Sequence, residues 1–157
     1  MEYSYIQLNN LPDEILIYIF KKLSNAEILY SLSGVNKRLN KIAHDSIFTS
    51  HLSLLRRCPD HSIYPLTDSM LDRFCSKILP EIHYKIKWIN LESSSMKYIL
   101  YAADYPNLNG LRLYNIEEKT AKCFFTGKQI SIESFLLETN ETYINTFISN
   151  LYLIMKF

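Results

Sequence analysis

The side chains best suited to catalysis or metal binding are scattered along this sequence. The histidines and cysteines are His44, His51, His61, His83, Cys58, Cys75 and Cys123. Successive histidines are 7, 10 and 22 residues apart. None of these spacings is the i, i+4 pair or the Cys-x-x-Cys pair that zinc sites use. The sequence therefore predicts no metal site, and we expect no cofactor.

A catalytic group is equally hard to find. Cys75 follows Phe74 in an expected helix, where a cysteine is usually a small core residue. Asp13 and Glu14 are adjacent, so they point in different directions and are better explained as partners of a helix dipole. A small enzyme stays an alternative, but it needs a convergent polar pocket, for which the sequence offers no candidate residues. We expect a non-catalytic protein.

The composition is that of a globular chain. Apolar residues make up 48% and charged residues 21% of the 157 residues. A net charge of +1 gives no indication of a nucleic-acid partner. Because the chain has only three glycines, a glycine-rich phosphate-binding loop is not expected. An odd cysteine count without a secretory signal predicts reduced thiols in the cytoplasm, the nucleus or both.

Membrane association is not expected. No window of about 18 residues is apolar enough to cross a bilayer. A membrane-associated tail at residues 144–157 is an alternative, but Asn145, Ser149 and Asn150 favour a buried amphipathic helix there.

Residues 11–50 have the pattern of three short helices. Pro12, Asp13 and Glu14 suit a first helical turn. The apolar residues that follow at helical spacing are Ile15, Leu16, Ile19, Phe20 and Leu23. Residues 24–27 have the form of a capping box for a second helix, which Gly34 can end. The apolar residues of the third helix are Val35, Leu39, Ile42 and Ile47.

Such a short helical segment rarely folds without help, because it is too small to bury enough surface. Its apolar surplus should therefore pack on the rest of the chain or on a partner. Residues 1–10 form a polar extension before it. Residues 51–67, with Arg56, Arg57 and two prolines, are interpreted as a connector.

Helix and strand patterns alternate in the next part of the chain. A helix is expected from Asp68 to Leu79, where Pro80 should stop it. The period then changes to alternation over residues 86–91, which indicates a strand. Residues 93–95 are three serines that predict the start of another helix, and residues 108–113 form a second expected strand.

The two expected strands repeat each other at a fixed offset. The apolar residues Ile86, Ile89 and Leu91 recur 22 residues later as Leu108, Leu111 and Leu113. This is the L-x-x-L-x-L spacing of leucine-rich repeats, whose period is about 20–29 residues. The usual Asn or Cys is Ile116 here, and a plain βαβ unit would give a similar pattern. We expect an irregular array of leucine-rich-repeat-like units over residues 68–126.

The pattern weakens towards the end. A helix through Ala121, Phe124 and Phe125 and a strand near residues 130–135 would continue the array. Residues 127–157 are an atypical segment, predicted to contain an amphipathic helix. The predicted fold class is α+β to α/β, with three N-terminal helices followed by a short strand–helix array.

The N-terminal part resembles an F-box. The family opens with Leu-Pro-x-Glu, as at residues 11–14, and carries Val-Cys-Lys/Arg-x-aromatic in its third helix, where this chain has Val35-Asn36-Lys37-Arg38-Leu39. Three positions depart from the family pattern: Asn36 replaces a frequent Cys, Leu39 an aromatic residue, and Phe48 a closing Trp. The match covers residues 11–50, roughly a quarter of the chain.

The resemblance implies a substrate-recruiting subunit of an SCF-type ubiquitin ligase. An F-box binds a Skp-family adaptor, which links it to a cullin-RING ligase, and the following repeats select the protein substrate. An exposed apolar stripe also suits docking of a helix into a groove. The residues expected to contact the adaptor are Leu11, Pro12, Glu14, Ile15, Leu16, Ile19, Phe20, Leu23, Val35, Lys37 and Leu39.

The alternative is a truncated F-box protein that occupies the adaptor as a decoy without delivering a substrate. No polar cap ends the expected array, so we also expect a shortened version of a longer receptor. The sequence identifies neither the substrate nor any need for phosphorylation.

Overall fold

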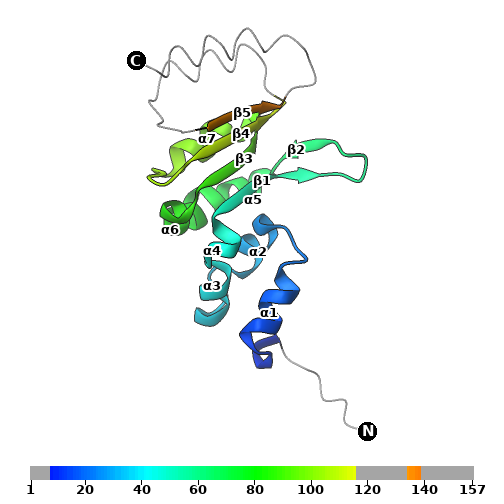
Figure 1. Ribbon diagram of the computed structural model, residues 1–157, viewed down its shortest axis with the longest axis vertical. Helices are drawn as coiled ribbons and strands as arrows, with labels where there is room; N and C mark the ends of the chain where they lie inside the picture. Colours follow the sequence, from blue (N-terminus) through cyan, green and yellow to red (C-terminus); the bar gives the residue numbers. More distant parts are fainter. Residues whose placement is uncertain (1–7, 116–133, 139–157) are drawn as a thin grey trace.

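The computed structural model describes residues 8–115 and the strand at residues 134–138. A helical part lies at one end of the molecule and a five-stranded sheet lies towards the other (Figure 1). The fold is thus a mixture of helix and sheet with helices first, and these helices are compatible with an F-box.

The N-terminal part contains more helices than predicted. After a 3-10 turn at Leu8–Asn10, they are α1 (Asp13–Phe20), α2 (Asn25–Leu32), α3 (Lys37–Ala43) and α4 (Ser46–Thr49). The predicted third helix is split because the Asp45 carboxylate accepts a hydrogen bond from the Ile47 amide at 2.9 Å and so starts α4. Val35 lies before α3 rather than within it.

The predicted capping box of α2 is confirmed. The Ser24 hydroxyl accepts from the Glu27 amide at 3.2 Å, and the Glu27 carboxylate accepts from the Ser24 amide at 2.9 Å. Hydrogen bonding to the Ser24 backbone amide, and then to the Ser24 side chain, holds the pKa of the Glu27 carboxylate below its usual value. Gly34 follows the helix with a φ of +79°, a conformation that glycine adopts at little cost.

The sheet begins earlier than the sequence indicated. Its strands are β1 (His51–Arg57), β2 (Ile63–Pro65), β3 (Trp88–Glu92), β4 (Gly110–Tyr114) and β5 (Ser134–Glu138), in the spatial order β2-β1-β3-β4-β5. β1, β3, β4 and β5 run parallel, and β2 returns antiparallel to β1. The expected connector at residues 51–67 therefore contains a β-hairpin.

The 22-residue offset is confirmed as a structural register. Ile89 lies opposite Leu111, and Leu91 lies opposite Leu113. Ile86 and Leu108 are buried but precede their strands. The strand predicted near residues 130–135 begins later, at Ser134. The predicted helix near residues 121–125 and the predicted C-terminal amphipathic helix lie outside the described residues.

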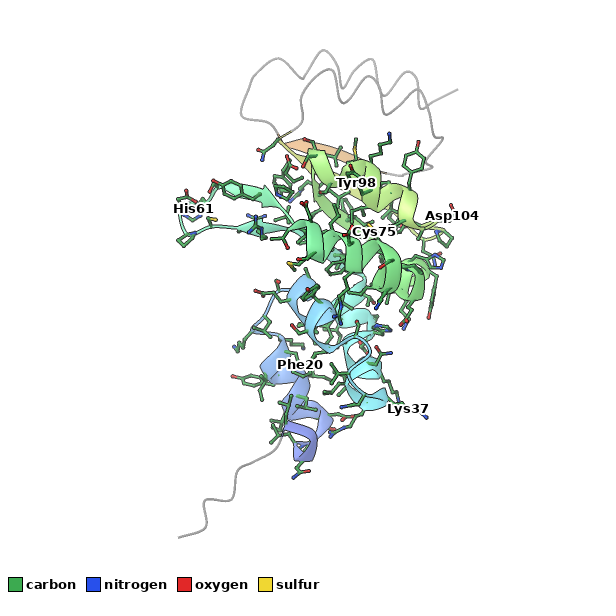
Figure 2. The ribbon with its side chains drawn as sticks, turned by 180° about the vertical axis from the view of Figure 1, so that it is seen from behind. Phe20, Lys37, His61, Cys75, Tyr98 and Asp104 are labelled. Atoms are coloured by element: carbon green, nitrogen blue, oxygen red, sulfur yellow. The ribbon has the colours of Figure 1, made fainter. Side chains whose placement is uncertain are left out.

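Helices cover one face of the sheet. The segment between β2 and β3 comprises α5 (Asp68–Arg73), a π-helical turn (Phe74–Ile78), α6 (Leu79–Ile82) and a 3-10 turn (His83–Lys85). A 3-10 turn (Ser93–Ser95) and α7 (Met96–Ala102) join β3 to β4. Figure 2 shows the helical segment that contains Cys75 in front of the strands.

Pro80 does not stop the helical segment, contrary to the prediction. The π-helical turn ends at Ile78, so Pro80 falls in the first turn of α6. An amide at that position has no partner within its own helix, and proline therefore costs little there.

One apolar core extends through both parts of the molecule. Its buried residues come from α1 to α4, from the strands and from the helices behind them. Leu16 and Phe48 from the helical part belong to the same cluster as Leu52 and Ile89 from the sheet. The helical part therefore buries its apolar surplus partly on the sheet, as its small size requires.

Candidate functional site

The start of α1 is held in place by α3. The Arg38 guanidinium donates a hydrogen bond to the Leu11 carbonyl oxygen and lies 2.6 Å from the Asp13 carboxylate. Asp13 and Glu14 occupy the first turn of α1, where negative charge opposes the helix dipole. Because α3 begins beside the start of α1, Val35 and Lys37 lie at the same end of the molecule, as the position of Lys37 in Figure 2 shows.

α1 has two apolar sides. Leu16 and Phe20 are four residues apart, so they share one face, which is buried. Ile15 and Ile19 share another face, and their side chains are 45% and 39% exposed. Leu23 follows on the turn after α1 and is also exposed. An isoleucine pair left on the surface of a helix costs solvation free energy unless a partner covers it.

The structure separates the predicted adaptor-contact residues into two groups. Those that are exposed are Pro12, Glu14, Ile15, Ile19, Leu23, Val35 and Lys37. We call this group the docking surface. Leu16, Phe20 and Leu39 are buried and Leu11 is half-buried against the core, so the first three are core residues rather than contacts. Leu8 and Tyr18 are exposed in the same segment and were not predicted.

The face of the sheet opposite its helices is only partly exposed: His51 and Arg57 are exposed, Trp88 and Asn90 are half-buried, and Glu92 and Tyr114 are buried. Side chains alternate between the faces of a strand. The residues that point towards the helices, such as Leu52, Ile89 and Leu111, are fully buried. The alternate residues form rows across the strands: His51, Trp88 and Gly110 in one, Ser53, Asn90 and Arg112 in the next. We call this surface the outer sheet face.

An aromatic platform occupies the first row of the outer sheet face. The rings of His51 and Trp88 are stacked, with 6.4 Å between centroids and 6° between planes. A Cβ atom on Gly110 would lie 2.4 Å from the Trp88 ring, so the indole extends over β4 only because residue 110 is glycine. In the next row the Asn90 amide donates to the Ser53 hydroxyl at 2.7 Å.

An arginine stands at the far end of the same face. The Arg57 guanidinium lies 5.7 Å from the centroid of the Tyr114 ring and donates to the Tyr114 hydroxyl at 3.4 Å. Within the described part of the chain, no carboxylate lies within ion-pairing distance of Arg57. Glu92 lies opposite Tyr114 and is buried, and its carboxylate accepts from the Ser94 amide at 2.8 Å and from the Ser94 hydroxyl.

Polar contacts join the helical part to the sheet part. His44 at the end of α3 is buried, with Nε2 3.2 Å from the Ser33 hydroxyl and Nδ1 3.8 Å from the Glu81 carboxylate. Burial lowers the pKa of His44, Glu81 raises it, and Lys85 lowers it again. The Lys85 ammonium also donates to the His44 carbonyl oxygen at 2.8 Å.

α5 and the start of β1 complete this junction. The Arg73 guanidinium of α5 lies 4.9 Å from the centroid of the Tyr30 ring and donates to the Ser33 carbonyl oxygen at 3.1 Å. The Asn25 amide donates to the His51 carbonyl oxygen at 2.9 Å. The helical part and the sheet part are therefore connected through a packed and hydrogen-bonded junction.

The remaining titratable groups show no arrangement for catalysis in residues 8–115. Burial and then the Asp72 carboxylate raise the pKa of the Cys75 thiol, which disfavours the reactive thiolate. Burial and then Cys75 raise the pKa of Tyr105, whose hydroxyl donates to the Ile99 carbonyl oxygen at 2.6 Å. Within the described residues there is no cluster of three metal-ligating side chains.

The described residues also contain no helix long and apolar enough to span a bilayer.

Neither a search of curated proteins nor a search of solved structures finds a significant match to the chain. A scan of protein families does give a match: residues 8–54 fit the family described as F-box-like. This range contains the helices α1 to α4 and the whole docking surface. The chain therefore carries an F-box-like domain in its N-terminal part.

Proposed function

We propose that this protein is a substrate-recruiting subunit of an SCF-type ubiquitin ligase. Its F-box-like domain would bind a Skp-family adaptor, and the sheet part would hold a protein substrate. The observation that carries the proposal is an F-box-like segment whose first helix keeps Ile15 and Ile19 exposed while the neighbouring Leu16 and Phe20 are buried. F-box domains generally bind Skp-family adaptors and are non-catalytic, so we assign the chain no chemical step.

The docking surface has the composition of a protein interface. Its apolar residues are flanked by Glu14 and Lys37, so a hydrophobic centre is edged by charge. Each large aliphatic side chain that becomes covered contributes about 1.5–3 kcal/mol. Three such anchors are enough for a stable interface after the ordering costs of association are deducted.

The proposed substrate-holding part is an irregular leucine-rich-repeat-like array. This proposal is supported by four parallel strands that pair in chain order and by leucines or isoleucines at matching positions of β1, β3 and β4. An array of this kind leaves one sheet face open to a partner. We place the protein in the cytoplasm or nucleus, where the proposed ligase acts.

A matched pair of variants tests the adaptor contact. Ile15→Lys places a charge in the docking surface, whereas Ile47→Lys makes the same change on α4, outside it. The two side chains are 45% and 48% exposed, so both variants should fold. Ile15→Lys should weaken binding to a purified Skp-family adaptor at least tenfold, since tenfold corresponds to about 1.4 kcal/mol.

Circular dichroism checks that both variants keep their helix content. Equal adaptor affinity of the wild type and Ile15→Lys would contradict the docking assignment. Loss of binding in Ile47→Lys alone would place the contact elsewhere. A ubiquitination assay of co-purifying proteins then separates a receptor, which delivers a modified substrate, from a decoy, which binds the adaptor and delivers none.

A further inference from the structure

The exposed side of α1 carries opposite charges at its two ends. Glu14 lies in the first turn of the helix, Lys21 caps its end, and Lys22 follows. All three side chains are exposed, and the salt bridges found within the described residues involve none of them. The Lys22 ammonium instead lies 5.0 Å from the centroid of the Tyr18 ring. A partner surface that fits this side therefore carries the same charges in the reverse order.

Apolar side chains fill the space between these charges. Ile15, Tyr18 and Ile19 are 45%, 64% and 39% exposed. Ile19 lies one helical turn after Ile15, and Tyr18 lies beside both, so the three form a continuous apolar strip. Glu14 and Lys21 are two turns apart, roughly 10 Å along the helix axis, and lie on the same edge of the strip.

A second copy of α1 has the required order of charges when it runs antiparallel to the first. In a symmetric dimer, a two-fold axis between the helices places Glu14 of each copy beside Lys21 of the other. The same axis places Ile15 of one copy within about one residue of the level of Ile19 of the other. The exposed side of α1 is therefore complementary to itself in charge and in apolar contact.

The position of α1 leaves this side accessible to a second copy. α1 lies at the end of the described molecule that is away from the sheet, as Figure 1 and the position of Phe20 in Figure 2 show. The contact centres on a helix of eight residues and is therefore small. Small interfaces belong to weak and reversible association, so we expect the dimer to form at micromolar concentrations rather than below them.

We propose that the protein without its adaptor forms a symmetric dimer through α1, with the two helices antiparallel and Glu14 of each copy facing Lys21 of the other. The dimer covers the same Ile15 and Ile19 side chains that the proposed function assigns to the adaptor. Adaptor and second copy therefore compete for one surface. This competition rests on the proposed function, whereas the dimer itself does not.

Charge reversals test the pairing, with sedimentation equilibrium of the full-length protein as the readout. Glu14→Lys and Lys21→Glu each replace two attractions across the two-fold axis by two repulsions, so each should weaken dimerisation about five- to tenfold. An equimolar mixture of the two variants restores both attractions and should dimerise within about threefold of the wild type. Lys97→Glu makes the same change of charge on exposed α7 and should leave dimerisation unchanged.

Several results would overturn the inference. One is a wild-type protein that stays monomeric up to about 1 mM. Another is a mixture of the two variants that dimerises no better than either variant alone, while circular dichroism shows that both keep their helix content. A third is a loss of dimerisation in Lys97→Glu equal to that in Lys21→Glu, which would place the contact elsewhere.

Excess purified Skp-family adaptor is then added to the wild type. Competition predicts complexes that contain one adaptor and one copy of this chain. Complexes with two copies of the chain would overturn the inference, because the dimer contact would then lie outside the docking surface. A monomeric chain that binds the adaptor would refute the dimer and leave the proposed function standing. A dimer that persists because the adaptor does not bind would refute the proposed function instead.

Discussion

The difference between Leu16 and its neighbour Ile15 shows how one residue position on α1 separates core from surface. Both are aliphatic and adjacent in sequence, but Leu16 is fully buried and Ile15 is 45% exposed. The sequence predicted a helix that starts at residues 12–14 and carries apolar residues at helical spacing as far as Leu23, including the apolar run of residues 15–20. It could not predict which side faces inward, because every residue of that run is apolar and each side of the helix is acceptable in the core.

Alanine substitutions should distinguish these two positions. Leu16→Ala should lower the free energy of unfolding by about 2–5 kcal/mol, because it removes buried methyl groups and leaves a cavity. Ile15→Ala should change it by less than about 0.5 kcal/mol, as is usual for surface positions. Urea unfolding measures both. Similar losses in the two variants would mean that the assignment of core and surface on α1 is wrong.

His44 should make the stability of the protein depend on pH. Burial lowers its pKa in the folded state below the usual 6.5, so folding favours the neutral ring. The corresponding stability is fully present above pH 6.5 and is lost as the pH falls through the folded-state pKa. Between pH 6.5 and pH 5, the wild type should therefore lose more stability than His44→Gln does.

The groups that face His44 set the size of this effect. Glu81 opposes the loss by attracting the protonated ring, and Lys85 adds to it by repelling the ring. Thermal unfolding at half-unit pH steps gives the difference between the two proteins. Parallel stability curves would show that His44 does not titrate differently in the folded and unfolded states.

Elements with a local signal were predictable and those fixed by tertiary contacts were not. The capping box of α2 and the 22-residue offset between β3 and β4 are both visible as residue spacings. β1 was not predicted, because Arg56, Arg57 and two prolines are residues typical of a loop. Leu52 and Leu54 nevertheless alternate with polar residues, which is a strand pattern. The π-helical turn has no comparable sequence signal.

The packing of β3 on β4 depends on the absence of a side chain at Gly110. Gly110→Ala places a methyl group 2.4 Å from the Trp88 ring, so the ring has to move. Because Trp88 is half-buried, it can swing outward, and the cost should be small, about 1 kcal/mol. The emission of Trp88 should shift towards longer wavelength. An unchanged spectrum would contradict the position of the indole over β4.

The molecule as a whole should unfold as one unit. The helical part and the sheet share one core, and Arg73, Lys85 and Asn25 bridge them with hydrogen bonds. Trp88 fluorescence reports on the sheet, and far-ultraviolet circular dichroism reports mainly on the helices. The two urea transitions should coincide. Two separate transitions would show that the helical part has an independent core.

The central claim is that the exposed side of the F-box-like helix α1 binds a Skp-family adaptor. Amide hydrogen exchange of the full-length chain, with and without saturating adaptor, tests it most directly. Binding should slow exchange in residues 8–24 and 35–38 and leave β1, β3 and β4 unchanged. Slower exchange confined to the strands, or no change anywhere at adaptor concentrations that saturate another F-box protein, would contradict the claim.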